Sequence, residues 1–502
     1  MNNGNKNKTK IVNTIGPAVT LKLFDRQSLA SNPEKLALAK KNCEDIIKAG
    51  SSVARFNFSH GTQEEQLIRM EMLREASRKL GLPYSLLLDT KGPEIRVYKF
   101  PDDGIQYEKG QTVTIYALKK LMATKNSFCV YDNSGKYNMA KDVKVGSKVL
   151  VEDGKFILVV KKVDVKGGVV TCEAINTHVV KNNKRINLPG ASYSMPFMSP
   201  KDKEDLIFAC KQGMNYVAAS FVNNTKDVAQ LRAVLNANGG KNVKLLAKIE
   251  SIDGTKNLDG IIKATDGIMV ARGDLGCDLP YEEVPYWQEQ MINKCRLANK
   301  PVIVATQMLD SMEKNLLPTR AEVTDVFMAG RQGTDSTMTS GETAQGSFPL
   351  NVVNTMKNIN KESEYLYKYS DALKSFMLTA KYAKISSKAK KVALDIAKAT
   401  YPKNETTPKA SFPYEFVVMF ENDEETINAV SAVRPGAAII VILDKIELYN
   451  AFGASYGIYT QLVSNLNVAK ANYKQVAKDA VKKLSEGSKK ACVYIKGKIQ
   501  TI

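Results

Sequence analysis

Short apolar runs that end in polar or charged residues recur along much of the chain. The run SSVARFNFS, which ends in Arg55, Asn57, Ser59 and His60, is followed by an amphipathic stretch over 64–80. Runs of this kind, rich in Leu, Ile and Val, are typical of parallel strands covered on both faces. The stretches between them are long enough for right-handed helical crossovers. The alternation therefore predicts repeated strand-helix units.

The stretch 244–276 shows this unit most clearly. Its first apolar run, LLAKI, leads into Glu250, and its second, GIMVA, leads into Arg272 and Asp274. We expect one helix over 255–264 between two parallel strands, which brings Glu250 and Asp274 to one end of the sheet. Two carboxylates with no His nearby form a hard oxygen site suited to Mg²⁺, and Lys248 is placed to meet an anion that the metal also holds. Such a set indicates phosphoryl transfer.

Eight strands of this kind are expected. They are KIVNTIG, SSVARFNFS, YSLLLDT, YVAASFV, the two strands of 244–276, PVIVATQ and STMTSGE. The main helices are expected over 33–49, 64–80, from Pro200 onward, and over 282–299. Eight strand-helix units predict an α/β fold, a (β/α)8 TIM barrel, whose active site lies at the C-terminal ends of the strands.

Two regions depart from this alternation. From about 97 to 188 the runs are short and alternating, with Gly, Asp and Asn turns, which predicts a small inserted β-barrel domain that acts as a lid. Beyond residue 360, runs such as FVVMF and AAIIVIL alternate with helical stretches over 426–433 and 475–484, which predicts a C-terminal α/β domain. The expected domains are 1–96 with 189–360, then 97–188, then 361–502.

The length, composition and charge of the chain exclude several classes of protein. A chain of 502 residues is too long for one core. No apolar run approaches the roughly 20 residues that span a bilayer, and MNNGNKNKTK lacks an apolar signal region, so we expect a soluble cytoplasmic protein with no membrane partner. Seven scattered cysteines without a C-x-x-C pair indicate reduced structural thiols. A net charge of +20 raises the question of nucleic-acid binding, but only 13 of the 72 basic residues are Arg. Because Arg-rich clusters interleaved with aromatic residues are missing, we expect no nucleic-acid partner.

The polar ends of the strands also carry a family resemblance. The segments KIVNTIGPA, SSVARFNFSHG, LLDTKGPEIR, AKIES, GIMVARGDLG, KPVIVATQMLDSM, PTRAEVTDV and SGETAQG, in this order, resemble pyruvate kinase. The match runs from Lys10 to Pro349 and extends more loosely through the other two domains. It implies transfer of the phosphoryl group of phosphoenolpyruvate to ADP, giving pyruvate and ATP in the last step of glycolysis, by a homotetramer.

The resemblance implies roles for the residues near the phosphoryl group. Lys248 is implied to stabilise this group in flight, and the planar fork of Arg55 to bind it. Glu250 and Asp274 are implied to hold Mg²⁺ or Mn²⁺, which also binds the substrate carboxylate. The backbone amides of Gly273 and Asp274, which open a helix in GDLG, are implied to receive that carboxylate.

Further roles follow from the same resemblance. Thr306 and Ser340 are implied near the enolate carbon. Because an ordinary hydroxyl is a poor acid, a water that they hold is expected as an alternative proton donor. A K⁺ site and a nucleotide site are also implied. The K⁺ ligands would be Asn57, Ser59, Asp89 and the Thr90 carbonyl, and the nucleotide would face Asn57, His60, Arg96 and Lys201.

Other interpretations fit parts of the pattern. Lys248 and Glu250 could form a salt bridge that lines the barrel, and Asn57 and Ser59 could cap a helix. A magnesium-dependent aldolase or lyase would share the carboxylate pair without needing the inserted domain, Arg55 or SGETA. A binding or structural protein with a decayed site would not need to keep all these polar residues.

Three segments predict how this chain differs within the family. STMTSGETA stands where a more apolar run is usual, so Thr337 and Thr339 are expected to alter packing behind the site. Relatives with Glu at the position of Glu94, in KGPEIR, need a monovalent cation, which predicts dependence on K⁺. The acidic loop ENDEET stands where relatives activated by fructose 1,6-bisphosphate have Ser, Thr and Gly, and its carboxylates oppose a phosphate. We expect no activation by this bisphosphate.

Overall fold

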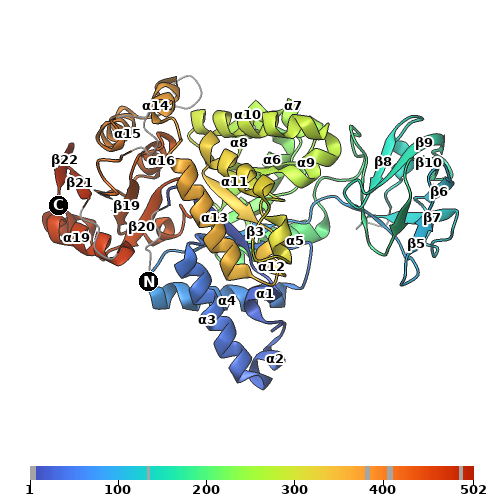
Figure 1. The fold of residues 1–502 in the computed structure, drawn as a ribbon, viewed down its shortest axis with the longest axis horizontal. Helices are drawn as coiled ribbons and strands as arrows, with labels where there is room; N and C mark the ends of the chain where they lie inside the picture. Colours follow the sequence, from blue (N-terminus) through green and yellow to red (C-terminus); the bar gives the residue numbers. More distant parts are fainter. Residues whose placement is uncertain (1–6, 133–135, 379–384, 404–410, 486–489) are drawn as a thin grey trace.

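The protein consists of three units in a row, with the main barrel in the middle, the inserted barrel at one end and the C-terminal sheet at the other (Figure 1). The computed structural model describes residues 7–132, 136–378, 385–403, 411–485 and 490–502. In the part of the chain so described, no helix combines the length and the apolar character needed to cross a membrane.

The main barrel is closed by eight parallel strands in the order β1-β17-β16-β15-β14-β13-β3-β2. Alternate residues of these strands, such as Val12, Leu87 and Met269, fill the interior, while their neighbours pack against the helices. The predicted TIM barrel is therefore confirmed. The strands are β1 (Lys10–Thr14), β2 (Val53–Asn57), β3 (Ser85–Asp89), β13 (Tyr216–Ala219), β14 (Lys244–Ile249), β15 (Gly267–Ala271), β16 (Val302–Ala305) and β17 (Ser336–Thr339).

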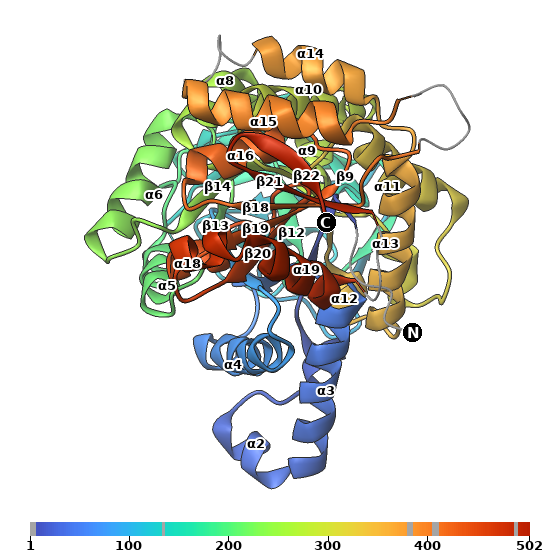
Figure 2. The same cartoon turned by 90° about the vertical axis from the view of Figure 1, so that its left-hand side faces the viewer.

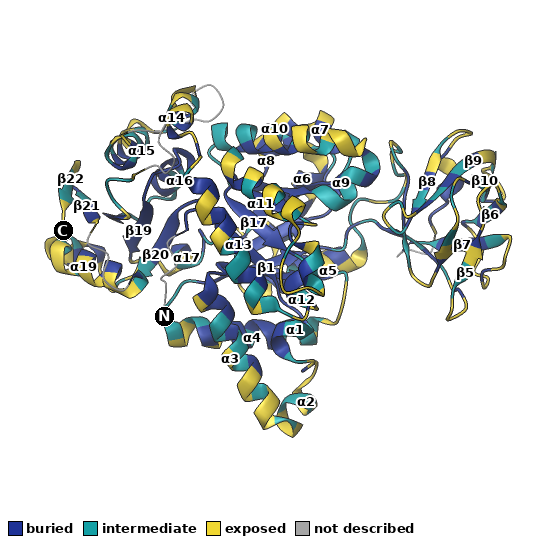
Figure 3. Ribbon diagram, viewed as in Figure 1, coloured by how far each residue is buried: buried dark blue, intermediate teal, exposed yellow. Residues whose placement is uncertain are grey.

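Long helices surround these strands, with buried inner faces and exposed outer faces (Figure 3). They are α3 (Pro33–Ala49), α4 (Gln63–Leu80), α5 (Pro200–Lys211), α6 (Thr225–Ala237), α10 (Val284–Leu297), α11 (Arg320–Gln332) and α13 (Pro349–Glu364). Shorter helical segments are α1 (Pro17–Thr20), α2 (Arg26–Ser31), α9 (Arg272–Asp278), α12 (Gly341–Ala344), η2 (Tyr281–Glu283) and η3 (Asp310–Glu313).

The helix expected over 255–264 is in fact two helices, α7 (Ile252–Lys256) and α8 (Leu258–Ala264). Asn257 ends the first and begins the second, with a backbone conformation outside the α-helical region. The side chain of Ser251 accepts a hydrogen bond from the backbone N–H of Gly254 and so caps α7 immediately after β14. The helical crossover therefore begins at the residue that follows Glu250 in the sequence.

The inserted unit is a closed seven-stranded barrel with the order β10-β6-β7-β4-β12-β8-β9, which confirms the predicted all-β insertion. Its own core includes Phe128, Phe156 and Val170. A two-stranded sheet, β5 (Ile105–Tyr107) with β11 (His178–Val180), and the 3-10 turn η1 (Met139–Lys141) lie beside it. The barrel strands are β4 (Ile95–Val97), β6 (Thr112–Tyr116), β7 (Ser127–Tyr131), β8 (Lys148–Val151), β9 (Phe156–Asp164), β10 (Val169–Ala174) and β12 (Arg185–Asn187).

The C-terminal unit is a five-stranded sheet in the order β20-β19-β18-β21-β22, with helices on both faces (Figure 2). The edge strand β22 runs antiparallel and was not expected, because KIQT carries no apolar run. Its strands are β18 (Phe416–Phe420), β19 (Ala438–Leu443), β20 (Ile458–Leu462), β21 (Ala491–Ile495) and β22 (Lys498–Thr501). Its helices are α14 (Tyr369–Leu378), α15 (Ser387–Thr400), α16 (Glu424–Ala432), α17 (Ile446–Tyr449), α18 (Leu466–Ala471) and α19 (Tyr473–Leu484).

Two of the expected domain limits fall inside elements. The limit at 96/97 lies within β4, because that strand already begins at Ile95 in the KGPEIR segment, and the limit at 360/361 lies within α13, which continues to Glu364. The seven cysteines are free thiols, and all but Cys210 are buried. Burial raises the pKa of Cys43 and of Cys172 to about 12, which suits the structural role expected for the thiols.

Candidate active site

A cleft of about 540 Å³ lies between the main barrel and the inserted barrel, at the C-terminal ends of the main strands. Because parallel strands of a barrel all end on one face, polar residues distant in sequence meet here. Ten of the residues expected from the sequence line the cleft: Arg55, Asn57, Ser59, His60, Asp89, Arg96, Lys248, Glu250, Asp274 and Thr306.

Lys248 lies at the centre of a buried polar cluster. Its Nζ atom is 2.9 Å from Asp89 Oδ1, 2.8 Å from Ser220 Oγ and 3.1 Å from Glu250 Oε1. The salt bridge with Glu250 that was considered as an alternative is therefore present. It is one contact of an ammonium group that also faces the cleft.

Lys248 and Asp89 keep their charges although they are buried. Burial lowers the pKa of Lys248, but Asp89 and Glu250 outweigh this effect and leave that pKa above its usual value. Burial raises the pKa of Asp89, yet the cations of Arg55 and Lys248 more than offset it and hold the pKa below the usual range. An ammonium and a carboxylate that both stay ionised give the site a fixed electric field.

Glu250 and Asp274 lie at the ends of the adjacent strands β14 and β15, as expected. Burial, followed by the nearby charge of Asp274, raises the pKa of Glu250 to about 7 against the opposing effect of Lys248. The buried Oε2 atom of Glu250 accepts a hydrogen bond of 2.6 Å from the backbone N–H of Phe221. Two hard oxygen ligands on neighbouring strand ends fit Mg²⁺ or Mn²⁺, which bind proteins through one or two carboxylates. In the described residues, no group of three or more His, Cys, Asp or Glu side chains is arranged to hold a metal.

Arg55 is held in place from two sides. Its Nε donates to Asp89 Oδ2 at 2.7 Å, and its Nη1 donates to Thr14 Oγ1 at 2.8 Å. Thr14 ends β1 and Asp89 ends β3, so the strands on either side of β2 orient the guanidinium. Residues at the ends of both neighbouring strands thus fix the position of the Arg55 side chain in the cleft.

Asn57 and Ser59 do not cap the following helix, which corrects the alternative considered above. Thr62 is the N-cap of α4, and Asn57 Oδ1 accepts from the backbone N–H of Ser59 at 3.0 Å. Asn57 is the strand partner of Asp89 in the β2–β3 register. These oxygens therefore lie at adjacent strand ends, where a set of neutral and anionic oxygen ligands suits K⁺.

Thr306 lines the cleft with an unusual backbone. It has a φ of 70° and Gln307 has a φ of 53°, in the left-handed region that non-glycine residues rarely adopt. The Thr306 Oγ1 atom accepts a hydrogen bond of 2.7 Å from the backbone N–H of Gly273 and donates to the Ala305 carbonyl at 2.6 Å. The strained turn therefore places Thr306 against the start of α9, where Gly273 and Asp274 lie.

Four expected residues do not line the cleft. Thr90 is buried behind the cleft, where its carbonyl accepts a hydrogen bond from Ser220 Oγ at 2.7 Å. The backbone N–H of Gly273 donates to Thr306 Oγ1. Lys201 pairs with Asp205 at 2.9 Å on α5. Ser340 begins α12, and its backbone N–H donates to Glu342 at 2.6 Å. The structure thus does not bring Lys201 and Ser340 to the cleft.

The residues expected at the nucleotide lie on the rim. Arg96 pairs with Glu94 at 2.9 Å, and both line the cleft together with His60. Burial, and then the charge of Arg96, lower the pKa of His60, so that this imidazole is neutral at neutral pH. The rim therefore presents Arg96 as a cation and His60 as a neutral group.

Sequence reasoning missed several residues of the cleft, three of which contact Lys248, Glu250 or Asp274. Ser220 hydrogen-bonds Lys248, and it directly follows the run YVAA, so the rule that polar strand ends form the site would have found it. Arg185 enters from the inserted barrel and contacts Asp274 at 2.5 Å, and Phe221 lies beneath it. No local pattern marks these last two residues.

Thr337 and Thr339 form buried hydrogen bonds behind the site. Thr339 Oγ1 accepts from Asn13 Nδ2 at 2.8 Å, and Thr337 Oγ1 accepts from Asn360 Nδ2 at 2.8 Å. Thr339 also shares a hydrogen bond with Thr343 at 2.8 Å. A buried polar network thus joins β17 to β1 and α13.

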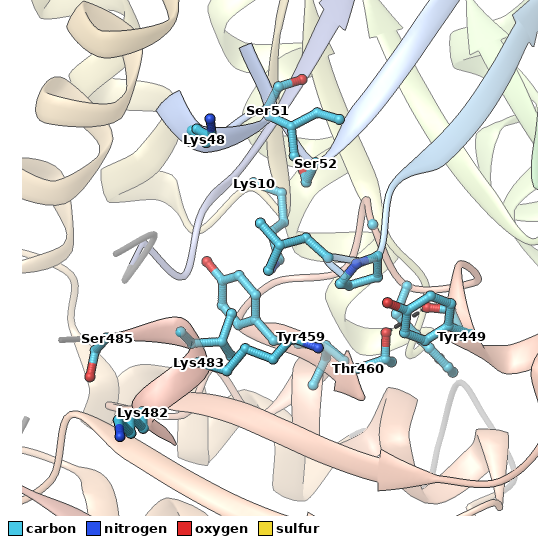
Figure 4. A pocket seen from close by; sticks show the side chains of 17 residues that line it. Lys10, Lys48, Ser51, Ser52, Tyr449, Tyr459, Thr460, Lys482, Lys483 and Ser485 are labelled. Carbon is cyan, nitrogen blue, oxygen red and sulfur yellow. Dashed lines mark hydrogen bonds between the residues drawn. The ribbon is translucent and has the colours of Figure 1, made fainter. Parts of the chain in front are cut away.

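A second cavity, of about 220 Å³, lies between the main barrel and the C-terminal unit (Figure 4). Lys10, Lys48 and Lys483 line it together with Tyr459 and Thr460. It contains none of the residues expected to bind the substrates or the metal ions. The catalytic chemistry therefore belongs to the first cleft.

The barrel, its inserted domain and the buried Lys–carboxylate cluster at the strand ends define a phosphotransferase of the TIM-barrel class. The family profile described as "Pyruvate kinase, barrel domain" matches residues 6–353. The chain belongs to the pyruvate kinase family, whose members transfer the phosphoryl group of phosphoenolpyruvate to ADP, giving pyruvate and ATP. The aldolase or lyase alternative is thereby set aside.

Individual relatives agree with this assignment. The chain is 48% identical over 480 residues to a pyruvate kinase of Mycoplasma pneumoniae, covering 95% of this chain and 94% of the relative. It is 47% identical over 460 residues to one of Mycoplasma genitalium, covering 91% and 90%. A crystal structure of a pyruvate kinase from Cryptosporidium parvum superposes with a TM-score of 0.83 at 29% identity, covering 99% of this chain and 96% of that one.

Proposed function

We propose that phosphoryl transfer in this cleft depends on Lys248, with Arg55 binding the oxygens of the moving group. The observation that carries this proposal is the buried ammonium of Lys248, held at 2.8 to 3.1 Å by Ser220, Asp89 and Glu250. Since the transferred group carries spread negative charge, catalysis of this class is mainly positioning and electrostatic stabilisation. A cation fixed before the substrate arrives supplies that stabilisation without further reorganisation.

We further propose that Glu250 and Asp274 hold Mg²⁺ or Mn²⁺, and that Asn57, Ser59, Asp89 and the Thr90 carbonyl hold K⁺. A divalent cation in this position supplies positive charge to the substrate carboxylate and phosphate. The backbone amides of Gly273 and Asp274 lie at the start of α9, next to this pair. The nucleotide is assigned to Asn57, His60 and Arg96, which line the cleft.

For the enolate carbon, the geometry supports Thr306 over Ser340. Thr306 lines the cleft, whereas Ser340 does not. The Thr306 hydroxyl already donates its proton to the Ala305 carbonyl at 2.6 Å. We therefore assign proton delivery to a water held by Thr306, because the hydroxyl proton is already engaged.

A cytoplasmic homotetramer is proposed as the working form. Large apolar side chains, including Tyr281, Tyr286 and Leu317, are exposed on the main barrel, and this supports self-association of the chain. Sedimentation velocity at micromolar concentration tests it. A single species at the mass of one 55.3 kDa chain would contradict it.

The substitution Lys248→Met tests the central assignment. We expect pyruvate formation from phosphoenolpyruvate and ADP to fall at least about a hundredfold, since a single preorganised donor contributes roughly 3 kcal/mol or more. The free energy of unfolding should also fall by about 3 kcal/mol, because Asp89 and Glu250 lose a buried partner. The assay is therefore run below the melting temperature of the variant, with Mn²⁺ binding measured on the same sample.

Lys155→Met is the matched control. Lys155 lines the same cleft from the inserted barrel and pairs with Glu152, at 3.3 Å, rather than with Glu250 or Asp274. Its variant should keep turnover within a few fold of the unmodified enzyme. A folded Lys248→Met enzyme with more than a tenth of normal turnover would show that Lys248 does not have this role.

A further inference from the structure

Arg185 connects the two barrels through the carboxylate assigned to the metal. Its Nη1 atom lies 2.5 Å from Asp274 Oδ1, and the two side chains are only 19% and 17% exposed. Arg185 belongs to β12 of the inserted barrel, whereas Asp274 lies in the first turn of α9 in the main barrel. The contact therefore joins the two barrels across the cleft.

The guanidinium is held in this position by its surroundings. The Arg185 backbone is fixed in the inserted sheet, where its carbonyl accepts from the N–H of Glu152 at 3.0 Å. Its Cζ atom lies 4.9 Å from the ring centroid of Phe221, a geometry suited to a cation–π contact. The ring follows β13 of the main barrel. Three separate elements thus set the direction of one side chain.

The charges around Arg185 keep it a permanent cation. Burial lowers its pKa, but Asp274, Glu94 and Glu250 outweigh this and raise the pKa above its usual value. The same guanidinium opposes the rise in the pKa of Glu250. Arg185 therefore forms an ion pair with one carboxylate of the proposed metal site, Asp274, and adds positive charge near the other, Glu250.

We propose that Arg185 is an internal counter-ion that closes the inserted barrel on Asp274 and exchanges with the divalent cation at that carboxylate. This rests on the proposed assignment of Glu250 and Asp274 as metal ligands. The guanidinium at 2.5 Å already takes up one lone pair of this carboxylate, and its positive charge repels a divalent cation that approaches the same group. Metal binding and this closing contact therefore compete, and Arg185 acts as a positioning residue.

Mn²⁺ binding to the full-length protein without substrates tests the exchange. The free ion is measured by electron paramagnetic resonance for the unmodified protein, Arg185→Gln, Lys155→Gln and Asp274→Asn. We expect Arg185→Gln to bind Mn²⁺ about tenfold more tightly, near the lower end of coupling energies for close charge pairs. Lys155→Gln removes the same charge from the same barrel without touching Asp274, and it should change the affinity less than twofold.

The variants separate the possible failures. If Asp274→Asn leaves the affinity unchanged, the proposed metal site is wrong, and the exchange fails with it. If Asp274→Asn weakens Mn²⁺ binding tenfold or more while Arg185→Gln stays within twofold of Lys155→Gln, or binds more weakly, only the role of Arg185 is overturned.

The closing role is measured independently by small-angle X-ray scattering. We expect the radius of gyration of Arg185→Gln to exceed that of the unmodified protein, because the inserted barrel loses its contact with α9. The increase should also appear on adding saturating Mn²⁺ to the unmodified protein. An equal radius in all samples overturns the closing role.

Discussion

Lys8 and Lys10 are two residues apart at the start of the chain and differ in what surrounds their amino groups. The Lys8 ammonium donates to the Gly436 carbonyl at 3.0 Å and lies 3.5 Å from Glu364. Lys10 is 3% exposed, and its Nζ lies 3.1 Å from the ring centroid of Tyr459. Burial lowers the pKa of both, and that of Lys10 falls well below its usual value. Lys8 thus has a hydrogen-bonding and a charged partner, whereas the burial of the charged Lys10 costs free energy.

We expect Lys10→Met to raise the free energy of unfolding at pH 7 by about 1 to 2 kcal/mol, because a buried charge is replaced by an apolar chain of similar length. The lowered pKa means that the unfolded chain binds more protons than the folded one. The stability of the unmodified protein therefore rises with pH up to about 10, where the unfolded lysine titrates. Urea unfolding at pH 7 and pH 9.5 should show the advantage of the variant shrinking.

Lys8→Met serves as the opposite control. It removes the ammonium paired with the buried Glu364 carboxylate, which keeps only the hydrogen bonds from the backbone N–H groups of residues 8 and 9, so stability should fall by about 2 kcal/mol. Equal effects of the two substitutions would contradict this account.

Dependence on K⁺ is the second prediction at the scale of a residue. Glu94 lines the cleft and pairs with Arg96 at 2.9 Å. Because this position carries a glutamate, it does not supply the positive charge that a lysine would bring. Replacing K⁺ by tetramethylammonium at constant ionic strength should abolish most pyruvate formation. Full turnover in that buffer would refute the K⁺ assignment. Thermal melting in both buffers provides the control for folding.

Residue patterns predicted part of this site and could not predict the rest. Lys248, Glu250 and Asp274 were found because parallel strands of a barrel end on one face, so their position follows from the chain order. Arg185 was not found because its partner lies in another domain, and the orientation of two closed barrels leaves no mark in local periodicity. Lys201 was expected at the cleft from the family resemblance, but its ammonium pairs with Asp205 on the same helix.

At the scale of elements, the start of α16 and the loop before it use their carboxylates structurally. Asp423 caps the helix by accepting from the backbone N–H of Thr426, and Glu421 pairs with Lys388 at 2.9 Å. Glu424 pairs with Lys244 of β14, and Glu425 accepts from the backbone N–H of Ser386 at 3.0 Å. Acidic residues also suit the positive N-terminal end of a helix. This segment was read correctly as acidic, but its partners on α15 and β14 were not foreseen.

We therefore expect no activation by fructose 1,6-bisphosphate. Each carboxylate within about 4 to 6 Å of a phosphate opposes it by roughly 1 kcal/mol or more per unit charge. Titrating the bisphosphate at subsaturating phosphoenolpyruvate should change the half-saturating substrate concentration by less than twofold. A clear fall in that concentration would show that the loop accepts a phosphate after all.

At the scale of the whole molecule, the C-terminal unit is joined to the main barrel by a buried charge cluster. Arg434 is 1% exposed and donates to Asp335 Oδ2 at 2.6 Å and to the Gly333 carbonyl at 3.0 Å. Asp335 Oδ1 also accepts from the backbone N–H of Tyr456 at 3.0 Å. Since Asp335 directly precedes β17, the cluster ties the C-terminal unit to the strand that closes the barrel.

Arg434→Met should lower the free energy of unfolding by about 3 to 5 kcal/mol, because it leaves Asp335 buried without its cation. Differential scanning calorimetry should show the melting temperature fall, with the C-terminal unit unfolding in a separate, earlier transition. Lys374→Met, which alters an exposed pair with Asp371, is the control and should change little. A melting profile identical to that control would contradict the role of Arg434.

The pairing of β1 with β17 has a consequence for synthesis on the ribosome. Asn13 and Thr339 meet across this seam although they are 326 residues apart. At roughly 5 to 20 residues per second, the first strand waits about 16 to 65 seconds for its last neighbour. The inserted barrel, whose strands all lie between Ile95 and Asn187, emerges complete well before then. During that interval β1 presents an open hydrogen-bonding edge, and unpaired edges of this kind favour aggregation until the partner strand is made.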